Sequence, residues 1–324
     1  MILVGKAHFC QFKTIQSAVD ALEKRPHPHS DRTIYILEGY YEEQVMIQSS
    51  HLHLKGIGQV VIDYHLSANQ LDEDGEPLGT FRTATFYLAG SHHLIENLTI
   101  VNSAGYGERV GQAIALYADC DDTVFRNCRM MGYQDTLFSG QLPSKQKDGS
   151  DFITMGHDLV KPRHYRQYYE DCLIAGSVDF IFGGAQAYFY RCELHSRKEG
   201  ERRNGYITAA STPKEQTNGF VFQDCFLTAE EGVNHVYLGR PWRPYAKTVF
   251  IDCQYDSHIH PAGWHDWSKP NNQLTARYCE YSKQALVERV TWAKQSKDRP
   301  QDDKQSFFSE TDFIKRIVTY GKDD

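Results

Sequence analysis

Short hydrophobic and aromatic runs, each closed by polar residues, recur along the middle of the chain. Each run has an aromatic or aliphatic pair, two mostly polar residues and then Cys or Leu. Successive runs end 30, 44, 20, 33 and 28 residues apart. The shortest interval fits one turn of a parallel β-helix, with loops of variable length between the strands. The runs are LIENL at 94–98, VFRNC at 124–128, YYEDC at 168–172, YFYRC at 188–192, VFQDC at 221–225 and VFIDC at 249–253.

The rest of the pattern favours strands over helices. The β-branched and aromatic runs are separated by Gly, Asn and Asp, and few stretches keep a 3.6-residue apolar period. Two exceptions lie near the ends. Residues 14–24 predict a helix with Thr14 as its N-cap, and residues 309–319 predict a second one. A solenoid has open ends, so we expect the first helix to cap one end and the second to pack near the other. The apolar positions of the first helix are Ile15, Ala18, Val19 and Leu22.

These elements predict an all-β fold, a parallel β-helix that forms one domain over residues 1–324. Residues 139–164 are polar, contain two Pro and three Gly, and lack the repeat. We expect this segment, called the excursion below, to leave the coil as a long loop. Residues from about 294 to 324 form a C-terminal helical tail.

The composition and charge of the chain limit its possible partners and its cellular location. The net charge of −7 argues against nucleic acid or a membrane surface as the partner. No apolar run approaches the length of a membrane span, and the start MILVGKAHFCQ lacks an export signal. The prediction is a cytoplasmic monomer, or a secreted one if a leader has been removed. Five of the eight cysteines share one repeat position, which predicts a stacked internal row of reduced thiols.

Two aspartates occupy equivalent places in the repeat. Asp135 follows Cys128 by seven residues, and Asp179 follows Cys172 by seven. If these coils are adjacent, the carboxylates lie one strand spacing apart, about 4.8 Å. The 44-residue interval could instead hide a further coil and separate them by roughly 10 Å. We prefer the adjacent arrangement, because the excursion accounts for the extra length.

A close carboxylate pair has a chemical use and also a plainer explanation. Two neighbouring carboxylates do not ionise together cheaply, so one becomes an acid and the other a base or nucleophile. Asp is also common in turns and at helix N-caps. The pattern alone leaves both interpretations open.

Seven motifs resemble those of the pectin methylesterases (pectinesterases), which are carbohydrate esterases with a right-handed parallel β-helix. They occur in the family's order from about residue 12 to residue 293. The motifs are FKTIQSAVDAL at 12–22, GYYEE at 39–43, GQAIAL at 111–116, GYQDTLF at 132–138, VDFIFG at 178–183 and LGRPW at 238–242, followed by PAGWHDW at 261–267.

The resemblance implies a catalytic role for five residues. Asp179 corresponds to the nucleophile and Asp135 to the general acid that later acts as the base. Gln112 and Gln134 correspond to the amides that stabilise the oxyanion, and Arg240 to the guanidinium that orients the nucleophile. Neutral amide donors suit a tetrahedral oxyanion, and no step needs a metal or another cofactor.

It also implies contacts with the sugar chain. Trp242 corresponds to a stacking residue, and we expect Trp264 to line the same cleft. Phe81, Thr85 and Tyr133 are further candidates. The expected partner is methyl-esterified homogalacturonan or its oligogalacturonides.

Other interpretations stay open. A polygalacturonase or another glycoside hydrolase can use paired carboxylates on the same scaffold, but the two amides fit an acyl oxyanion better. A non-catalytic pectin-binding β-helix would leave buried charges without a use. The missing export signal suggests an intracellular bacterial enzyme that acts on imported short oligogalacturonides. Three His-x-His pairs could hold a metal, but no third ligand is evident, so we expect none; the pairs are His27/His29, His51/His53 and His258/His260.

Overall fold

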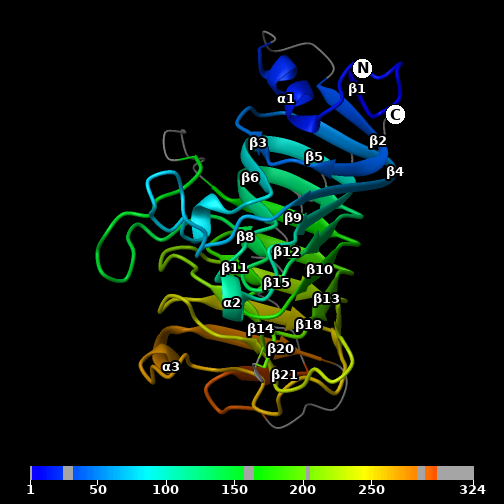
Figure 1. Ribbon diagram of the computed structural model, residues 1–324. Coiled ribbons are helices and arrows are strands. Elements are labelled where there is room, and N and C mark those ends of the chain that lie inside the picture. The colour runs from blue at the N-terminus through cyan, green and yellow to red at the C-terminus, as the bar shows by residue number, and fades with distance from the viewer. Residues whose placement is uncertain (1, 25–31, 157–163, 202–204, 283–288, 298–324) are drawn as a thin grey trace.

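The computed structural model describes residues 2–24, 32–156, 164–201, 205–282 and 289–297. Its strands stack as successive coils from β1 (Ile2–Val4) at one end to β21 (Lys294–Ser296) at the other (Figure 1). The named strands pair in parallel throughout, for example β7 (Arg129–Met131) with β10 (Leu173–Gly176). The predicted parallel β-helix is confirmed.

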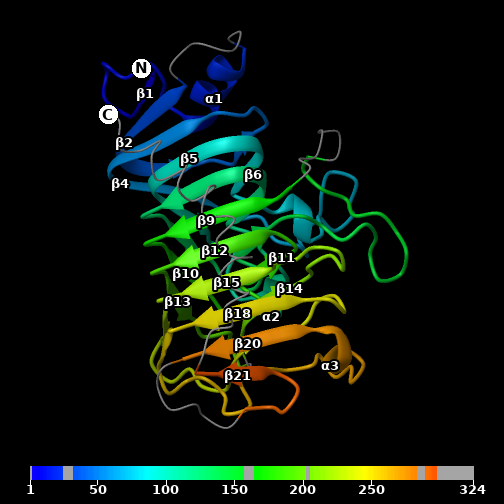
Figure 2. The ribbon, with the colours of Figure 1, turned by 180° about the vertical axis from the view of Figure 1, so that it is seen from behind.

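Each coil contributes strands to three faces. The first face will carry the candidate site, and its strands are β3 (Val45–Ile47), β8 (Leu137–Ser139), β11 (Ile181–Gly183), β14 (Gly205–Ala210) and β17 (Val236–Gly239). The second face is stacked side by side in Figure 2 and consists of β9 (Arg166–Glu170), β12 (Gln186–Tyr190), β15 (Phe220–Gln223), β18 (Lys247–Ile251), β20 (Arg277–Tyr281) and β21. The third face consists of β7, β10, β13 (Glu193–Ser196), β16 (Phe226–Ala229) and β19 (Gln254–Tyr255).

Near the N-terminus, single long strands bend from one face to the next. The start of β5 pairs with β3, and its later residues pair with β7. These long strands are β2 (Thr33–Glu42), β4 (His53–Tyr64), β5 (Phe86–Asn102) and β6 (Leu116–Arg126). Helical segments are short: α1 (Ile15–Glu23), a 3₁₀ turn at Thr80–Arg82, α2 (Gly107–Val110) and α3 (Asn272–Thr275). Among the described residues, no helix combines the length and apolar character needed to cross a bilayer.

The interior is filled by side chains that repeat from coil to coil. One row of rings stacks with centroids 4.5–4.7 Å apart, close to the spacing of the strands. The predicted row of cysteines is confirmed, since all five thiols are buried and free, and Cys172, for example, donates to the Phe125 carbonyl of the coil before it at 3.5 Å. The rings are Phe125, Tyr169, Phe189, Phe222 and Phe250.

Helix α1 covers the N-terminal end of the stack, as the apolar pattern predicts. Its four predicted apolar side chains are all buried, and the Thr14 hydroxyl accepts from the Ser17 N–H. The Glu43 carboxylate accepts from the Ile15 and Gln16 N–H groups at 2.8 and 2.9 Å, which satisfies two more free donors of the first turn. The helix predicted at 309–319 lies outside the described residues.

The coils on either side of the excursion are direct neighbours. β9 pairs with β6, and β10 pairs with β7. No coil lies between them, so the preferred explanation of the 44-residue interval is confirmed. The described part of the excursion, residues 139–156, extends from the side of the stack near β11 (Figures 1 and 2).

Candidate active site

Asp135 and Asp179 occupy the same place on adjacent coils. Each lies two residues before a strand of the first face, and these strands, β8 and β11, pair with Leu137 opposite Ile181. The Asp135 N–H donates to the Val178 carbonyl at 3.0 Å. Both aspartates have positive φ, 65° and 49°, a conformation that Asp tolerates better than most residues. The backbone thus holds two carboxyl groups one strand spacing apart.

Arg240 completes this group from a coil further along. It follows β17, and its Nε and Nη2 donate to the two Asp179 oxygens at 2.8 and 2.7 Å. Its guanidinium carbon lies 3.8 Å from the ring centroids of both Tyr206 and Trp267. The pair is well shielded, because the Asp179 and Arg240 side chains are only 8% and 17% exposed. A two-point ion pair between aromatic rings fixes the orientation of the carboxylate.

Burial favours a different protonation state for each of the two acids. It raises the pKa of Asp135 well above the ordinary Asp value, and the charge of Asp179 raises it further, although Arg240 opposes the shift. Burial alone would lower the pKa of Arg240, but its attraction to Asp179 outweighs this and raises it. The arrangement therefore favours a protonated Asp135 beside an ionised, arginine-bound Asp179.

These groups open into a cavity of about 400 Å³. Gln112 and Gln134 also line it, so both predicted amides lie with the two acids. Space for Gln134 depends on Gly107 in α2, because a Cβ there would lie 2.4 Å from the Cβ of Gln134. The structure thus brings together all five residues to which the resemblance assigns a catalytic role.

Aromatic side chains form one wall of the cavity. Phe81 and Trp242, both predicted, line it with ring centroids 6.3 Å apart and planes within 25°. Phe152, from the excursion, packs against Phe81 with centroids 5.3 Å apart. Phe81 itself is buried, whereas Trp242 and Phe152 are partly exposed, and a partly exposed ring in a polar cleft is suited to stacking against a sugar.

Trp264 requires a correction, because it does not line the cleft. Position 264 bridges to Gly239 like a strand residue, which turns the side chain inward. It is 1% exposed, stacks on Tyr278 at 4.3 Å and donates to a Glu280 carboxylate oxygen at 3.0 Å. Trp267, three residues later in the same motif, lines the cavity instead. The motif was the right signal, but it does not show which tryptophan points outward.

Two other predicted contacts also lie away from the cavity. Thr85 is fully buried, and its hydroxyl donates to the Val101 carbonyl at 2.8 Å, so it cannot touch a sugar. The Tyr133 ring packs against the Arg197 guanidinium at 4.0 Å and edge-on against Tyr106. It does not belong to the cavity lining.

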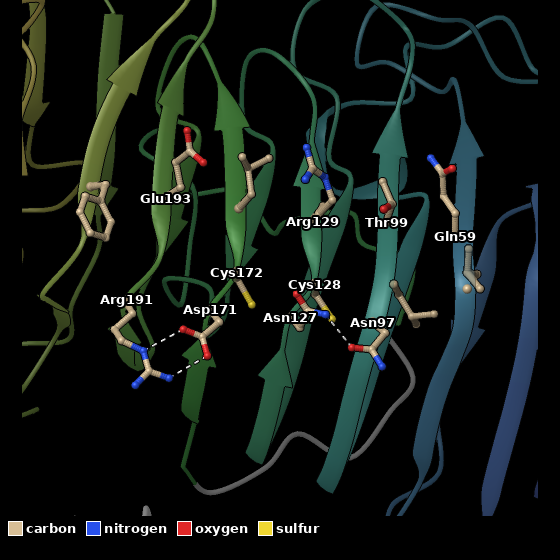
Figure 3. A pocket seen from close by; sticks show the side chains of 15 residues that line it. Gln59, Asn97, Thr99, Asn127, Cys128, Arg129, Asp171, Cys172, Arg191 and Glu193 are labelled. Carbon is tan, nitrogen blue, oxygen red and sulfur yellow. Dashed lines mark hydrogen bonds and ion pairs between the residues drawn. The ribbon is translucent and has the colours of Figure 1, made fainter.

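A larger cavity, about 480 Å³, lies along the third face (Figure 3). Several of its polar groups are paired with one another: Arg191 binds Asp171 through two hydrogen bonds, and Asn127 donates to Asn97 at 2.8 Å. This larger cavity runs along the row of turns that precede the cysteines. We place function at the smaller cavity, because the buried acid pair lies there.

No group of three or more His, Cys, Asp or Glu side chains is placed to hold a metal ion within the described residues. His27 and His29, one of the His-x-His pairs, lie outside them.

The parallel β-helix, the carboxyl pair, the arginine and the aromatic cleft agree with the arrangement that the motifs imply. The profile of the pectinesterase family matches residues 1–145 and 154–316. The chain belongs to the pectinesterase family.

Individual relatives agree with this assignment. The chain is 32% identical over 304 residues to a probable pectinesterase/pectinesterase inhibitor 21 of Arabidopsis thaliana; the match covers 90% of this chain and 41% of that protein. It is 31% identical to a pectinesterase of Petunia integrifolia, over 87% of this chain and 71% of that protein. The chain therefore spans less than half the length of the first of these relatives.

Solved structures share the fold across nearly the whole chain. Pectin methylesterase from carrot matches with a TM-score of 0.79 and 27% identity, over 98% of this chain and 95% of that one. PemA from Erwinia chrysanthemi matches with a TM-score of 0.74 and 25% identity, over 97% and 96%. A pectin methylesterase in complex with a hexasaccharide matches with a TM-score of 0.73 and 26% identity, over 94% of each chain.

Proposed function

We propose that this chain hydrolyses the methyl esters of galacturonate in pectin or oligogalacturonides, releasing methanol through an aspartyl acyl-enzyme. The observation that carries the proposal is the Asp179 carboxyl group, held by two hydrogen bonds from Arg240 beside a buried Asp135 whose pKa is raised. Family membership supports the reaction, and the hexasaccharide bound by a similar structure supports a sugar chain as the substrate.

In the first half of the reaction, an Asp179 oxygen attacks the ester carbonyl carbon. Negative charge develops on the carbonyl oxygen, where the amides of Gln112 and Gln134 donate hydrogen bonds. The tetrahedral intermediate collapses as the carbon–methoxy bond breaks. Asp135 gives its proton to the departing oxygen, so methanol leaves and an acyl-enzyme remains on Asp179.

In the second half, Asp135 acts as a base. It takes a proton from water as the water oxygen bonds to the acyl carbon, and the bond to Asp179 then breaks. The product is the free uronic acid, and both aspartates return to their starting protonation states. The partly exposed Trp242 and Trp267 hold the sugar chain by stacking, and the buried Phe81 supports Trp242 from the wall of the cavity.

The source and setting of the protein are proposed separately. We propose an intracellular, monomeric bacterial enzyme that acts on imported oligogalacturonides. Similar proteins come from plants and bacteria, and they do not decide this point. Fractionation that found the native protein outside the cell would contradict the location, and light scattering tests the monomer.

The direct test measures methanol and new reducing ends in parallel on highly methylated pectin and on methylated oligogalacturonides. We expect methanol without reducing ends, and no methanol from Asp179→Asn. New reducing ends without methanol would replace the esterase with a glycoside hydrolase. Pectin binding by the wild type with neither product would indicate a non-catalytic binding protein.

A further inference from the structure

Part of the cavity wall is built by residues outside the family match. The pectinesterase profile leaves residues 146–153 unmatched. Four side chains of this segment nevertheless line the cavity with the two acids: Gln146, Lys147, Asp148 and Phe152. This chain therefore adds its own side chains to the substrate cavity.

The added wall is anchored to the β-helix. Arg243 donates to the Lys145 carbonyl at 3.1 Å, and the Met155 N–H donates to the Phe81 carbonyl at 3.2 Å. Within the loop, Lys145 pairs with Asp151 at 2.7 Å, and the Gln146 N–H donates to the Ser150 carbonyl at 2.9 Å. These contacts hold the loop tip, with Lys147, against the cavity.

Positive charge gathers at this tip. The Lys147 Nζ lies 4.9 Å from the ring centroid of Trp267, the indole that also stacks on Arg240. Arg243 lines the same cavity, and its guanidinium lies 4.9 Å from the Trp242 ring. Burial lowers the pKa of Lys147, and the nearby charges of Lys269, Arg243 and Arg240 lower it further. We call Lys147, Arg243 and Lys269 the cationic cluster.

The members of the cationic cluster are not paired directly with carboxylates. Across the described residues, none of its three members forms an ion pair with Asp or Glu. Asp148 also lines the cavity; its Oδ1 accepts from the Ser150 N–H and hydroxyl at 3.0 and 2.7 Å, which lowers its pKa, so its negative charge offsets part of the positive charge of the cluster. Neighbouring cations in a cleft attract an anion of the substrate, because each lowers the energy of a carboxylate placed between them.

We propose that the cationic cluster binds a free galacturonate carboxylate on a sugar next to the one whose ester is cleaved, so that the protein prefers partly de-esterified chains. A methyl ester has no charge and gains little from such a site. This inference rests on the proposed function for its place in the reaction, but carboxylate binding is testable without catalysis.

The test compares Lys147→Gln with Lys214→Gln. Lys214 is a matched control, because it is exposed and its Nζ lies 5.4 Å from the Tyr245 ring, outside the cavity. Methanol release is measured on fully methylated and half-methylated hexagalacturonate. We expect Lys147→Gln to lower the ratio of kcat/KM for half-methylated over fully methylated substrate about fivefold. Lys269→Gln should change it in the same direction by less, and Lys214→Gln should leave it unchanged.

Calorimetry with de-esterified trigalacturonate gives a second readout. Lys147→Gln should weaken binding about fivefold, and added salt should weaken the wild type more than the variant. The inference would be overturned if Lys147→Gln changed neither the ratio of kcat/KM nor the binding of trigalacturonate, even if its activity fell equally on both substrates. If the wild type releases no methanol but binds trigalacturonate through Lys147, the proposed function fails and the carboxylate site stands.

Discussion

Two aspartates that lie eight residues apart in the sequence each form an ion pair with an arginine, and the two pairs differ in their surroundings. Asp171 accepts from Arg191 at 2.8 and 2.7 Å, and Asp179 accepts from Arg240 at the same two distances. Both aspartates have positive φ, 52° and 49°. The side chains of the first pair are each 46% exposed, whereas those of the second are 8% and 17% exposed.

The difference shows what turns a common structural pair into a candidate active site. Asp171 belongs to a row of turns with φ between 50° and 59° that repeats along the stack, and water screens its ion pair. Asp179 is shielded by rings and lies beside a second acid. The two pairs therefore share their hydrogen-bond geometry. Only the Asp179–Arg240 pair is buried and lies beside a second carboxyl group. The turn row consists of Asn97, Asn127, Asp171, Arg191, Asp224 and Asp252.

The largest expected contrast comes from removing each carboxylate charge. Asp179→Asn should lower the kcat for methanol release by more than about 10³-fold, because an amide cannot act as the nucleophile. Asp171→Asn should change kcat less than about twofold and lower the free energy of unfolding by no more than about 1 kcal/mol. Equal activities of the two variants would remove the distinction between the pairs.

Replacing each arginine by lysine tests the two-point contact. Arg240→Lys keeps the charge but loses the forked hydrogen bonds and the stacking on Tyr206 and Trp267, so we expect kcat to fall about 10²-fold. Arg191→Lys should have almost no effect on the same methanol assay. Wild-type activity in Arg240→Lys would mean that a positive charge is enough.

The two tryptophans of the PAGWHDW motif sharpen the contrast between interior and cleft. Trp264→Leu should lower the free energy of unfolding by about 3 kcal/mol, because it leaves a cavity and removes a donor from buried Glu280. Trp267→Leu should lower kcat/KM about tenfold with little change in stability, because it removes ring contacts to Arg240 and the sugar. Urea unfolding and methanol kinetics on both variants check this, and the reverse pattern would contradict the placement of the two rings.

The smallest expected effects concern how the free energy of unfolding depends on pH, and they have opposite signs at the buried Asp135 and the exposed Asp171. Burial raises the pKa of Asp135 above its ordinary 3.8, so Asp135 stabilises the fold most in acid and loses this contribution as pH rises through its folded pKa. Asp135→Asn should therefore be more stable than the wild type at neutral pH, by at least about 1 kcal/mol.

Asp171 should behave in the reverse way. Its hydrogen bonds from Arg191 lower its pKa below 3.8, so its contribution is present above that pH and is lost as pH falls through the folded pKa. Asp171→Asn should be slightly less stable than the wild type at neutral pH. Urea unfolding at about pH 2, 4, 5.5 and 7 should show the Asp135 gap closing as the pH falls toward 4 and the Asp171 gap closing only below that pH. If Asp135→Asn and Asp171→Asn changed the stability at neutral pH in the same direction, burial would not explain the difference between the two acids.

The sequence predicted the parts of the site that follow the repeat. Asp135 and Asp179 share an offset from their cysteines, so stacking the coils brings them together. Arg240 has no such link to them, and only the family resemblance indicated it. Trp267 reaches the cavity through a left-handed turn at φ 63°, which no spacing in the sequence reveals. Lys147 was missed because the excursion has no repeat, and its position depends on contacts with distant residues such as Arg243.

The separation between Asp179 and Arg240 has a consequence during synthesis. Asp179 emerges from the ribosome 61 residues before Arg240, the arginine that pairs with it, and Asp135 emerges earlier still. A nascent chain released between these points can stack its first coils, but it must bring two carboxyl groups together without their counter-ion. The coil that carries Arg240 thus supplies the counter-ion of Asp179 only after both acids have been synthesised.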